Sequence, residues 1–362
     1  MGLMEDALNR VAPVDPGLFK KAEARLDSLT KPRGSLGRLE EFAKKMAAIT
    51  GRLRPEIKKK YIFTFASDHG VAEEGVSAFP KEVTRQMVFN FLGNGAGINV
   101  LARHVGAEVI VIDIGVDFDF NGSPGLIHKK VVRGSRNMRF GPAMTKEEAK
   151  RCIEAGIEVA TAYASEGAIY GTGEMGIANT TPASAVTAVF TGAKIGDVTG
   201  RGTGIDDGAY AKKIQVIKDA IRVNRPDASN PLDVLAKVGG PEIAGIAGLC
   251  IGAASLCIPV VVDGFISGAG ALAACELNNS VKDYLFAAHS SVEKGHRFIL
   301  ERLGLKPFVD LDMRLGEGTG AAIGISLVEA GLKIYNEMAT FTQAGVSNSP
   351  LTPPCQGGVR GG

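Results

Sequence analysis

Short apolar runs that end beside a glycine and a carboxylate recur along this chain. The runs cover residues 61–66, 108–114, 168–170 and 258–262, and the acids that follow them are Asp68, Asp117, Glu174 and Asp263. Continuous apolar runs are typical of strands that are covered on both faces of a parallel sheet. The carboxyl ends of such strands meet at one edge, where open parallel sheets bind their ligands. We therefore expect a cleft lined by carboxylates and exposed backbone N–H groups.

Helical patterns lie between these runs. Thr145 and Glu148 have the spacing of a capping box, which predicts a helix from there to about residue 164. Residues 319–338 carry apolar side chains three and four apart, which predicts a second helix. This alternation of strand and helix favours a doubly wound α/β domain over residues 59–340. Residues 1–58 predict helices with a turn at 31–35, and residues 341–362 predict a C-terminal segment or flexible tail.

Composition excludes several classes of protein. The 41 basic and 39 acidic residues leave a net charge of +2, so no strong field favours nucleic acid or a membrane surface. The five cysteines form no CxxC pair, and the N-terminus lacks a secretory apolar segment, which predicts a cytoplasmic protein. The five histidines lack metal-binding spacing, so we expect neither a metal nor a cofactor. The 47 glycines are roughly twice the number that average usage supplies, and they gather at the ends of the apolar runs.

Two functional alternatives arise from the same glycines. Gly171, Gly173 and Gly176 fit the dinucleotide fingerprint, with Asp197 near the position of a ribose-binding acid, which would indicate an NAD-dependent dehydrogenase. Glu174 would oppose a pyrophosphate in that loop. Glycine loops that hold a single phosphate, beside carboxylates that stabilise a cationic sugar or accept a proton, fit a ribotide better. A ribotide- or corrinoid-binding module without catalysis is the other alternative.

Longer motifs resemble one enzyme family in order from about residue 30 to 340. They are KPRGSLGRLE (31–40), SDHGV (67–71), GEMGIANTTP (173–182), KVGG (237–240), VDGF (262–265), EKG (293–295) and RLGEGTG (314–320). Together they resemble the nicotinate-nucleotide–dimethylbenzimidazole phosphoribosyltransferases of cobalamin nucleotide-loop assembly. These enzymes transfer 5-phosphoribosyl from nicotinate mononucleotide to 5,6-dimethylbenzimidazole or a related base, which gives α-ribazole 5′-phosphate and nicotinate.

The resemblance also implies an architecture and a set of site residues. It implies a homodimer, with a large Rossmann-like domain of parallel sheet and flanking helices and a smaller helical domain from the N- and C-terminal segments. Glu317 would accept the N–H proton of the benzimidazole, and Glu174 would be a second carboxylate that stabilises the ribosyl carbon. The substrate-binding residues that we expect are Gly176, Gly202, Gly204, Lys213 and Ser291 for the phosphate, Phe79 and Met87 for the base, and Thr180, which is as well suited to cap a helix. Asp68, Asp263, His289 and His296 receive no assigned role.

Overall fold

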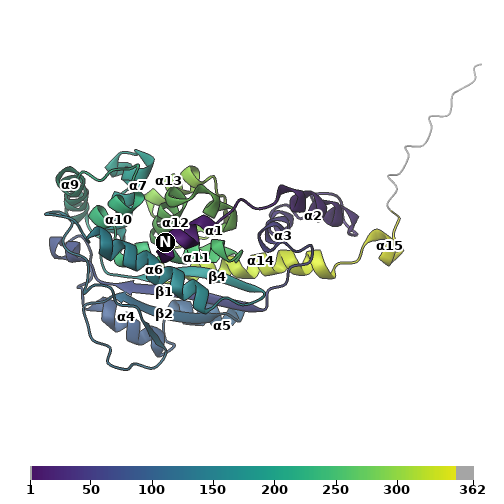
Figure 1. Cartoon of the computed structure of the whole chain (residues 1–362), viewed down its shortest axis with the longest axis horizontal. Coiled ribbons are helices and arrows are strands. Elements are labelled where there is room, and N and C mark those ends of the chain that lie inside the picture. Colours follow the sequence, from purple (N-terminus) through teal and green to yellow (C-terminus); the bar gives the residue numbers. More distant parts are fainter. Residues whose placement is uncertain (1, 348–362) are drawn as a thin grey trace, which may run out of the picture.

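The computed structural model describes residues 2–347, and its centre is one sheet of seven parallel strands (Figure 1). The strands are β1 (Lys59–Ser67), β2 (Glu108–Gly115), β3 (Leu126–His128), β4 (Ala168–Met175), β5 (Val260–Val262), β6 (Leu285–Ser290) and β7 (Pro307–Asp310). Their order is β3-β2-β1-β4-β5-β6-β7, so the chain reverses its direction of travel between β1 and β4. That reversal is the switch point at which sheets of this class bind ligands. The predicted Rossmann-like α/β fold is confirmed.

Helices cover both faces of the sheet. One face carries α11 and α12, with α6 packed outside α11, and the other carries α4, α5 and α14 (Figure 1). The helices of this part are α4 (Val83–Leu92), α5 (Gly97–Val105), α6 (Lys146–Ala162), α7 (Thr180–Thr191), α8 (Ile195–Val198), α9 (Asp207–Asn224), α10 (Pro231–Val238), α11 (Pro241–Ser255), α12 (Phe265–Leu277), α13 (Lys294–Leu303) and α14 (Thr319–Glu337), with short 3-10 helices at Gly70–Glu74 and Asn279–Tyr284. The capping box before α6 is confirmed, since Glu148 N–H donates to Thr145 Oγ1 at 3.1 Å.

The smaller helical part lies at one end of the long axis. It contains α2 (Pro16–Ser28), α3 (Arg38–Thr50) and α15 (Phe341–Ala344), and the far half of α14 runs alongside α3 (Figure 1). Gly331 of α14 allows α3 to approach closely, because a Cβ there would lie 2.6 Å from the carbonyl oxygen of Leu39. By contrast, α1 (Leu3–Arg10) packs on α6 and α11. Residues 348–362, the region of the expected tail, lie outside the described part of the chain.

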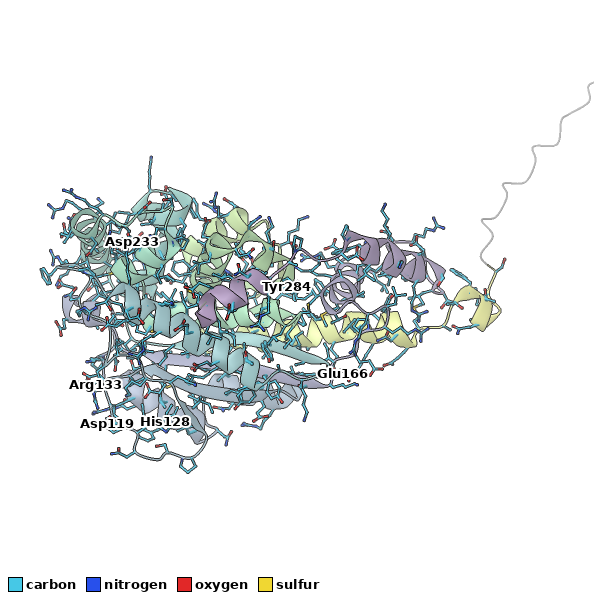
Figure 2. The ribbon with its side chains drawn as sticks, viewed as in Figure 1. Asp119, His128, Arg133, Glu166, Asp233 and Tyr284 are labelled. Atoms are coloured by element: carbon cyan, nitrogen blue, oxygen red, sulfur yellow. The ribbon has the colours of Figure 1, made fainter. Side chains whose placement is uncertain are left out.

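The two edges of the sheet face different surroundings. Figure 2 shows Asp119 and Arg133, which follow β2, at the opposite end of the sheet from Glu166, which precedes β4. The carboxyl edge therefore points away from the small helical part, and the amino edge points toward it. No helix within residues 2–347 combines the length and the apolar character that a membrane span requires.

The interpretation of residues 171–176 as a loop is wrong. β4 continues to Met175, so Gly171 and Gly173 lie inside the strand. These two glycines allow the start of α14 to pack closely on the strand. A Cβ on Gly171 would lie 3.1 Å from the Cβ of Ala321, and a Cβ on Gly173 would lie 2.2 Å from the carbonyl oxygen of Glu317. Because these glycines hold a helix rather than a pyrophosphate, the dehydrogenase alternative is not favoured.

Candidate active site

A cavity of about 740 Å³ opens at the carboxyl ends of β4, β5 and β6. Most of the predicted site residues line it, namely Glu174, Glu317, Gly176, Gly202, Ser291, Thr180, Phe79 and Met87. Lys213 lies buried behind the wall, and Gly204 is not part of the lining. Of the acids that end strands, Asp263 joins Glu174 and Glu317 there, whereas Asp68 and Asp117 do not. The expected cleft of carboxylates therefore forms at one side of the switch point.

Glu317 is held in an unusual backbone conformation on the loop before α14. Its φ is +64°, between Gly316 at +80° and Gly318 at +103°. A side chain rarely adopts this left-handed region without support from its surroundings. Thr64 on β1 supplies part of that support, because its hydroxyl donates to the carbonyl oxygen of Glu317 at 3.0 Å. The absence of a side chain on Gly173 makes the approach possible.

The carboxylate of Glu317 points at the start of α5. Its Oε2 accepts a hydrogen bond of 3.0 Å from the backbone N–H of Ile98, in the first turn of that helix. Burial raises the pKa of Glu317, and the Ile98 hydrogen bond lowers it in part. A helix N-terminus favours the ionised form. Among the described hydrogen bonds of this side chain, none involves Oε1. This oxygen is therefore available to accept a proton.

Glu174 is buried at the end of β4. Burial raises its pKa to about 8, and the neighbouring charges of Asp263 and Glu242 act in the same direction. The amide of Asn179 donates to its Oε2. Gly316 leaves space for the carboxyl group, because a Cβ there would lie 2.2 Å from Glu174 Oε1. Burial and these neighbouring charges therefore favour the protonated form of Glu174.

A cationic and hydroxyl-rich region forms the opposite wall. Lys213 is fully buried, and its Nζ donates to Thr180 Oγ1 at 2.7 Å. Burial lowers the pKa of Lys213 to about 8. α7 begins at Thr180, so its N-terminus opens on the cavity. Such a helix end is suited to an anion, and the lysine adds positive charge behind it.

Glu293 is a residue of this wall that sequence reasoning missed as a site residue, although its EKG motif was visible. Its Oε1 accepts the backbone N–H of Gly202 at 2.8 Å, and its Oε2 is buried without a hydrogen-bond partner. The carboxylate thus occupies an N–H group that was expected to bind phosphate. Ser291 is nearby on the lining, and His296 Nδ1 accepts its backbone N–H at 3.0 Å. Burial lowers the pKa of His296 to about 3, so the ring is a neutral structural partner.

The outer part of the cavity is apolar. Phe79, Val83, Met87 and Leu315 line it, and the side chains of Phe79 and Leu315 are 53% and 60% exposed. When large exposed apolar side chains lie together on a surface, they commonly mark a site that binds a ligand or a partner. An apolar wall of this kind suits contact with the faces of a heterocycle.

Comparisons with known proteins agree with the geometry. A family model described as phosphoribosyltransferase matches residues 11–346. The nicotinate-nucleotide–dimethylbenzimidazole phosphoribosyltransferase of Geobacter metallireducens is 65% identical over 347 residues, which are 96% of this chain and 98% of that protein. Its counterpart in Geobacter sulfurreducens is 62% identical over 96% and 99% of the two chains. The crystal structure of CobT from Thermus thermophilus superposes with a TM-score of 0.88 at 46% identity, over 92% of this chain and 100% of that chain.

Proposed function

The chain belongs to the nicotinate-nucleotide–dimethylbenzimidazole phosphoribosyltransferase family, and from this premise we propose how its site transfers phosphoribose. The enzyme moves the 5-phosphoribosyl group of nicotinate mononucleotide to 5,6-dimethylbenzimidazole or a related base. The observation that carries the proposal is one cavity that is lined by the carboxylates of Glu174 and Glu317 and by the N-terminus of α7, with the buried Lys213 behind that helix end. A ribotide presents the matching groups, a cationic ring linkage and a phosphate.

Glu317 acts as the general base. One ring nitrogen of the benzimidazole forms a bond to C1′, while the N–H proton on the other nitrogen goes to the free oxygen of Glu317. The bond from C1′ to nicotinate breaks, and its electron pair remains on the pyridine nitrogen, which becomes neutral. The leaving group therefore needs no acid, and the site has to supply one base and accurate positioning. The hydrogen bond from Ile98 to Oε2 supports this role, since it orients the carboxylate.

Glu174 stabilises the positive charge that develops on the ribosyl carbon. Because burial raises the pKa of Glu174 to about 8, binding of the cationic donor has to favour loss of its proton. The positively charged pyridinium of nicotinate mononucleotide has this effect, because a nearby positive charge lowers the pKa of a carboxyl group. Donor binding and ionisation of Glu174 are then coupled, which places the negative charge where the oxocarbenium-like carbon forms.

The phosphate binds at the wall formed by Gly176, Thr180, Gly202, Lys213 and Ser291. Gly202 gives its N–H to the phosphate only when Glu293 releases it, because the same N–H now donates to Glu293 Oε1. We include Gly204 as an outer part of this loop, whose N–H bonds to the carbonyl of Arg201 at 3.0 Å. Phe79 and Met87 contact the base. Their apolar side chains suit unsubstituted or methylated benzimidazoles and phenolic bases.

We also infer that the enzyme is a homodimer in the cytoplasm. The homodimer is the assembly that the resemblance to this family implies. Cys152, Cys250 and Cys275 are buried free thiols, which suits a reducing compartment. Light scattering of the purified protein gives the mass of the assembly, and a monomer at working concentration would contradict the dimer.

The transfer reaction is tested by incubating the protein with nicotinate mononucleotide and 5,6-dimethylbenzimidazole. Chromatography with mass detection should reveal equal amounts of free nicotinate and the new ribotide. Nicotinate that appears only when a base is present identifies transfer rather than hydrolysis. A panel of benzimidazoles and phenols then ranks the acceptors. Binding of the donor without any nicotinate release would contradict the enzymatic proposal and favour a binding module.

A further inference from the structure

We propose that Asp263 is a positioning residue for Glu317: its carboxylate, supplied by the end of β5, replaces the missing N-cap side chain of α14 and locks the loop that carries the base. The proposal rests on the proposed function only in taking Glu317 as the base. A carboxylate that ends a strand beside a glycine has many structural uses, so the case depends on which backbone groups Asp263 binds.

Asp263 binds the backbone at the start of α14. Its Oδ1 accepts the N–H groups of Gly320 and Ala321 at 2.6 and 3.1 Å, and its Oδ2 accepts the N–H of Gly318 at 3.2 Å. The N-cap residue of α14 is Gly318, which has no side chain to satisfy these donors. The first N–H groups of any helix need an acceptor from elsewhere. Here that acceptor comes from a residue 55 or more positions away in the chain.

One peptide unit is hydrogen-bonded by residues from β1 and from directly after β5, the two strands that flank β4. The peptide bond between Glu317 and Gly318 has its carbonyl oxygen bonded by Thr64 of β1 and its N–H bonded by Asp263 beyond β5. These two bonds fix the plane of that peptide, which sets ψ of Glu317 and φ of Gly318 directly beside the left-handed φ of +64° at Glu317. A glutamate has no intrinsic preference for this conformation, so the direction of its side chain depends on these external bonds.

Asp263 is itself held firmly enough to serve as an anchor. Only 2% of the residue is exposed, and its own N–H donates to Thr172 Oγ1 on β4 at 3.0 Å. Gly320 leaves the necessary space, since a Cβ there would lie 2.7 Å from Asp263 Oδ1 and 2.1 Å from the ring of His289. The titratable groups that face this anchor are Glu174, Glu317 and His289, whose Nε2 lies 3.8 Å from Asp263 Oδ1.

The test compares two variants with a control in the nicotinate-release assay. Asp263→Asn keeps the size of the side chain but cannot accept all three N–H groups, and Thr64→Val removes the bond to the other end of the same peptide. For Asp263→Asn we expect kcat to fall about 100-fold, the loss that misplacement of a catalytic group by about 1 Å causes. KM for both substrates should stay within about threefold of wild type, because the Asp263 carboxylate acts on the catalytic residue Glu317 and not on the bound substrates. Thr64→Val should lower kcat in the same manner by a smaller factor.

Asp68→Asn is the matched control. Asp68 is a buried strand-end acid whose Oδ2 accepts the N–H of Asp117 at 2.8 Å, outside the cavity lining. It should leave kcat unchanged. The pH profile separates positioning from a charge effect: displaced Glu317 loses the Ile98 hydrogen bond, so its pKa rises and the acidic limb of kcat moves to higher pH. Removal of a negative neighbour alone would move that limb to lower pH.

Three results would overturn the proposal. The first is an Asp263→Asn enzyme with normal kcat, and the second is one whose only defect is a raised KM. The third is an acidic limb that moves to lower pH with kcat retained. If Asp263→Asn does not fold, Thr64→Val decides, and a normal kcat in that variant rejects the locked peptide. A wild-type protein that releases no nicotinate would instead reject the transferase itself.

Discussion

The carboxylate of Glu317 and the backbone N–H of Ile98 are joined by a hydrogen bond of 3.0 Å between residues 219 positions apart. The bond places the carboxylate at the N-terminus of a helix, which favours its ionised form. Burial of the carboxylate in the cavity disfavours the same form. The balance is a pKa that is raised above the ordinary value of a glutamate. A raised pKa makes the ionised carboxylate a stronger base than an exposed glutamate.

The raised pKa of Glu317 predicts the pH dependence of turnover. The base has to be ionised, so kcat/KM, which reports the free enzyme, should fall as the pH drops through the pKa of Glu317, at a pH above the value of about 4.3 for an unperturbed glutamate. Measurement of kcat/KM from about pH 4.5 to pH 9 gives the limb. An acidic limb at or below the unperturbed value would show that Glu317 is not the group that titrates.

The stability of the ligand-free protein should fall as the pH rises from about 4 to about 8. Burial raises the pKa of Glu174 to about 8 and that of Asp263 to about 7, above their unfolded values near 4.3 and 3.9. The native state therefore binds more protons than the unfolded state between these limits, and its stability is lost as the pH rises through the folded pKa values. Thermal unfolding at about pH 6 and pH 9 should show a lower midpoint at the higher pH, and Glu174→Gln should reduce the difference. An equal loss in that variant would contradict the assignment.

Gly173→Ala should damage both folding and turnover. The new Cβ would lie 2.2 Å from the carbonyl oxygen of Glu317, which is backbone and cannot rotate away. We expect a loss of about 1–3 kcal/mol in the free energy of unfolding, as for other overpacked sites, together with a fall in kcat. Gly141→Ala is the control, because nothing lies within 4 Å of its added Cβ. Denaturant unfolding and the transfer assay measure the two effects, and a stable, fully active Gly173→Ala enzyme would refute the close contact.

Glu293→Gln should strengthen binding of the donor phosphate. The amide oxygen can still accept the N–H of Gly202, but the negative charge that a phosphate has to displace is gone. We expect the Kd for nicotinate mononucleotide to fall by about tenfold, or about 1.4 kcal/mol. Calorimetric titration with the donor and with inorganic phosphate measures it. Glu301→Gln, on the exposed face of α13, the helix that Glu293 precedes, should bind like wild type. Weaker binding by Glu293→Gln would show that this carboxylate assists the donor.

The sequence predicts the parts of the fold that repeat a strong local pattern. Continuous apolar runs predict β1 and β2, and apolar residues spaced three and four apart predict the helices α6 and α14. β3 and β7 have only three and four residues, and most of these are partly exposed, so no run marks them. The glycines of β4 suggested a loop because the same residues serve a turn and a close packing contact, and only the position of α14 separates the two.

The candidate site divides in the same way. Glu174 and Glu317 lie in motifs that a sequence displays, and both line the cavity. The residues that support Glu317 do not lie in such motifs. Ile98 contributes a backbone N–H that almost any residue has, and Thr64 contributes one hydroxyl within an apolar strand. Asp263 and Asp68 look alike in the sequence, and the position of β5 beside α14 gives only one of them a place at the site.

The central claim is that Glu317 accepts the proton of the incoming base, and Glu317→Gln tests it most directly. The amide can still accept the Ile98 N–H, so circular dichroism and the Kd for nicotinate mononucleotide should match wild type. The rate of nicotinate release at saturating base should fall about 10²–10⁴-fold, the contribution of a general base. A folded Glu317→Gln enzyme that releases nicotinate at nearly the wild-type rate would contradict the account.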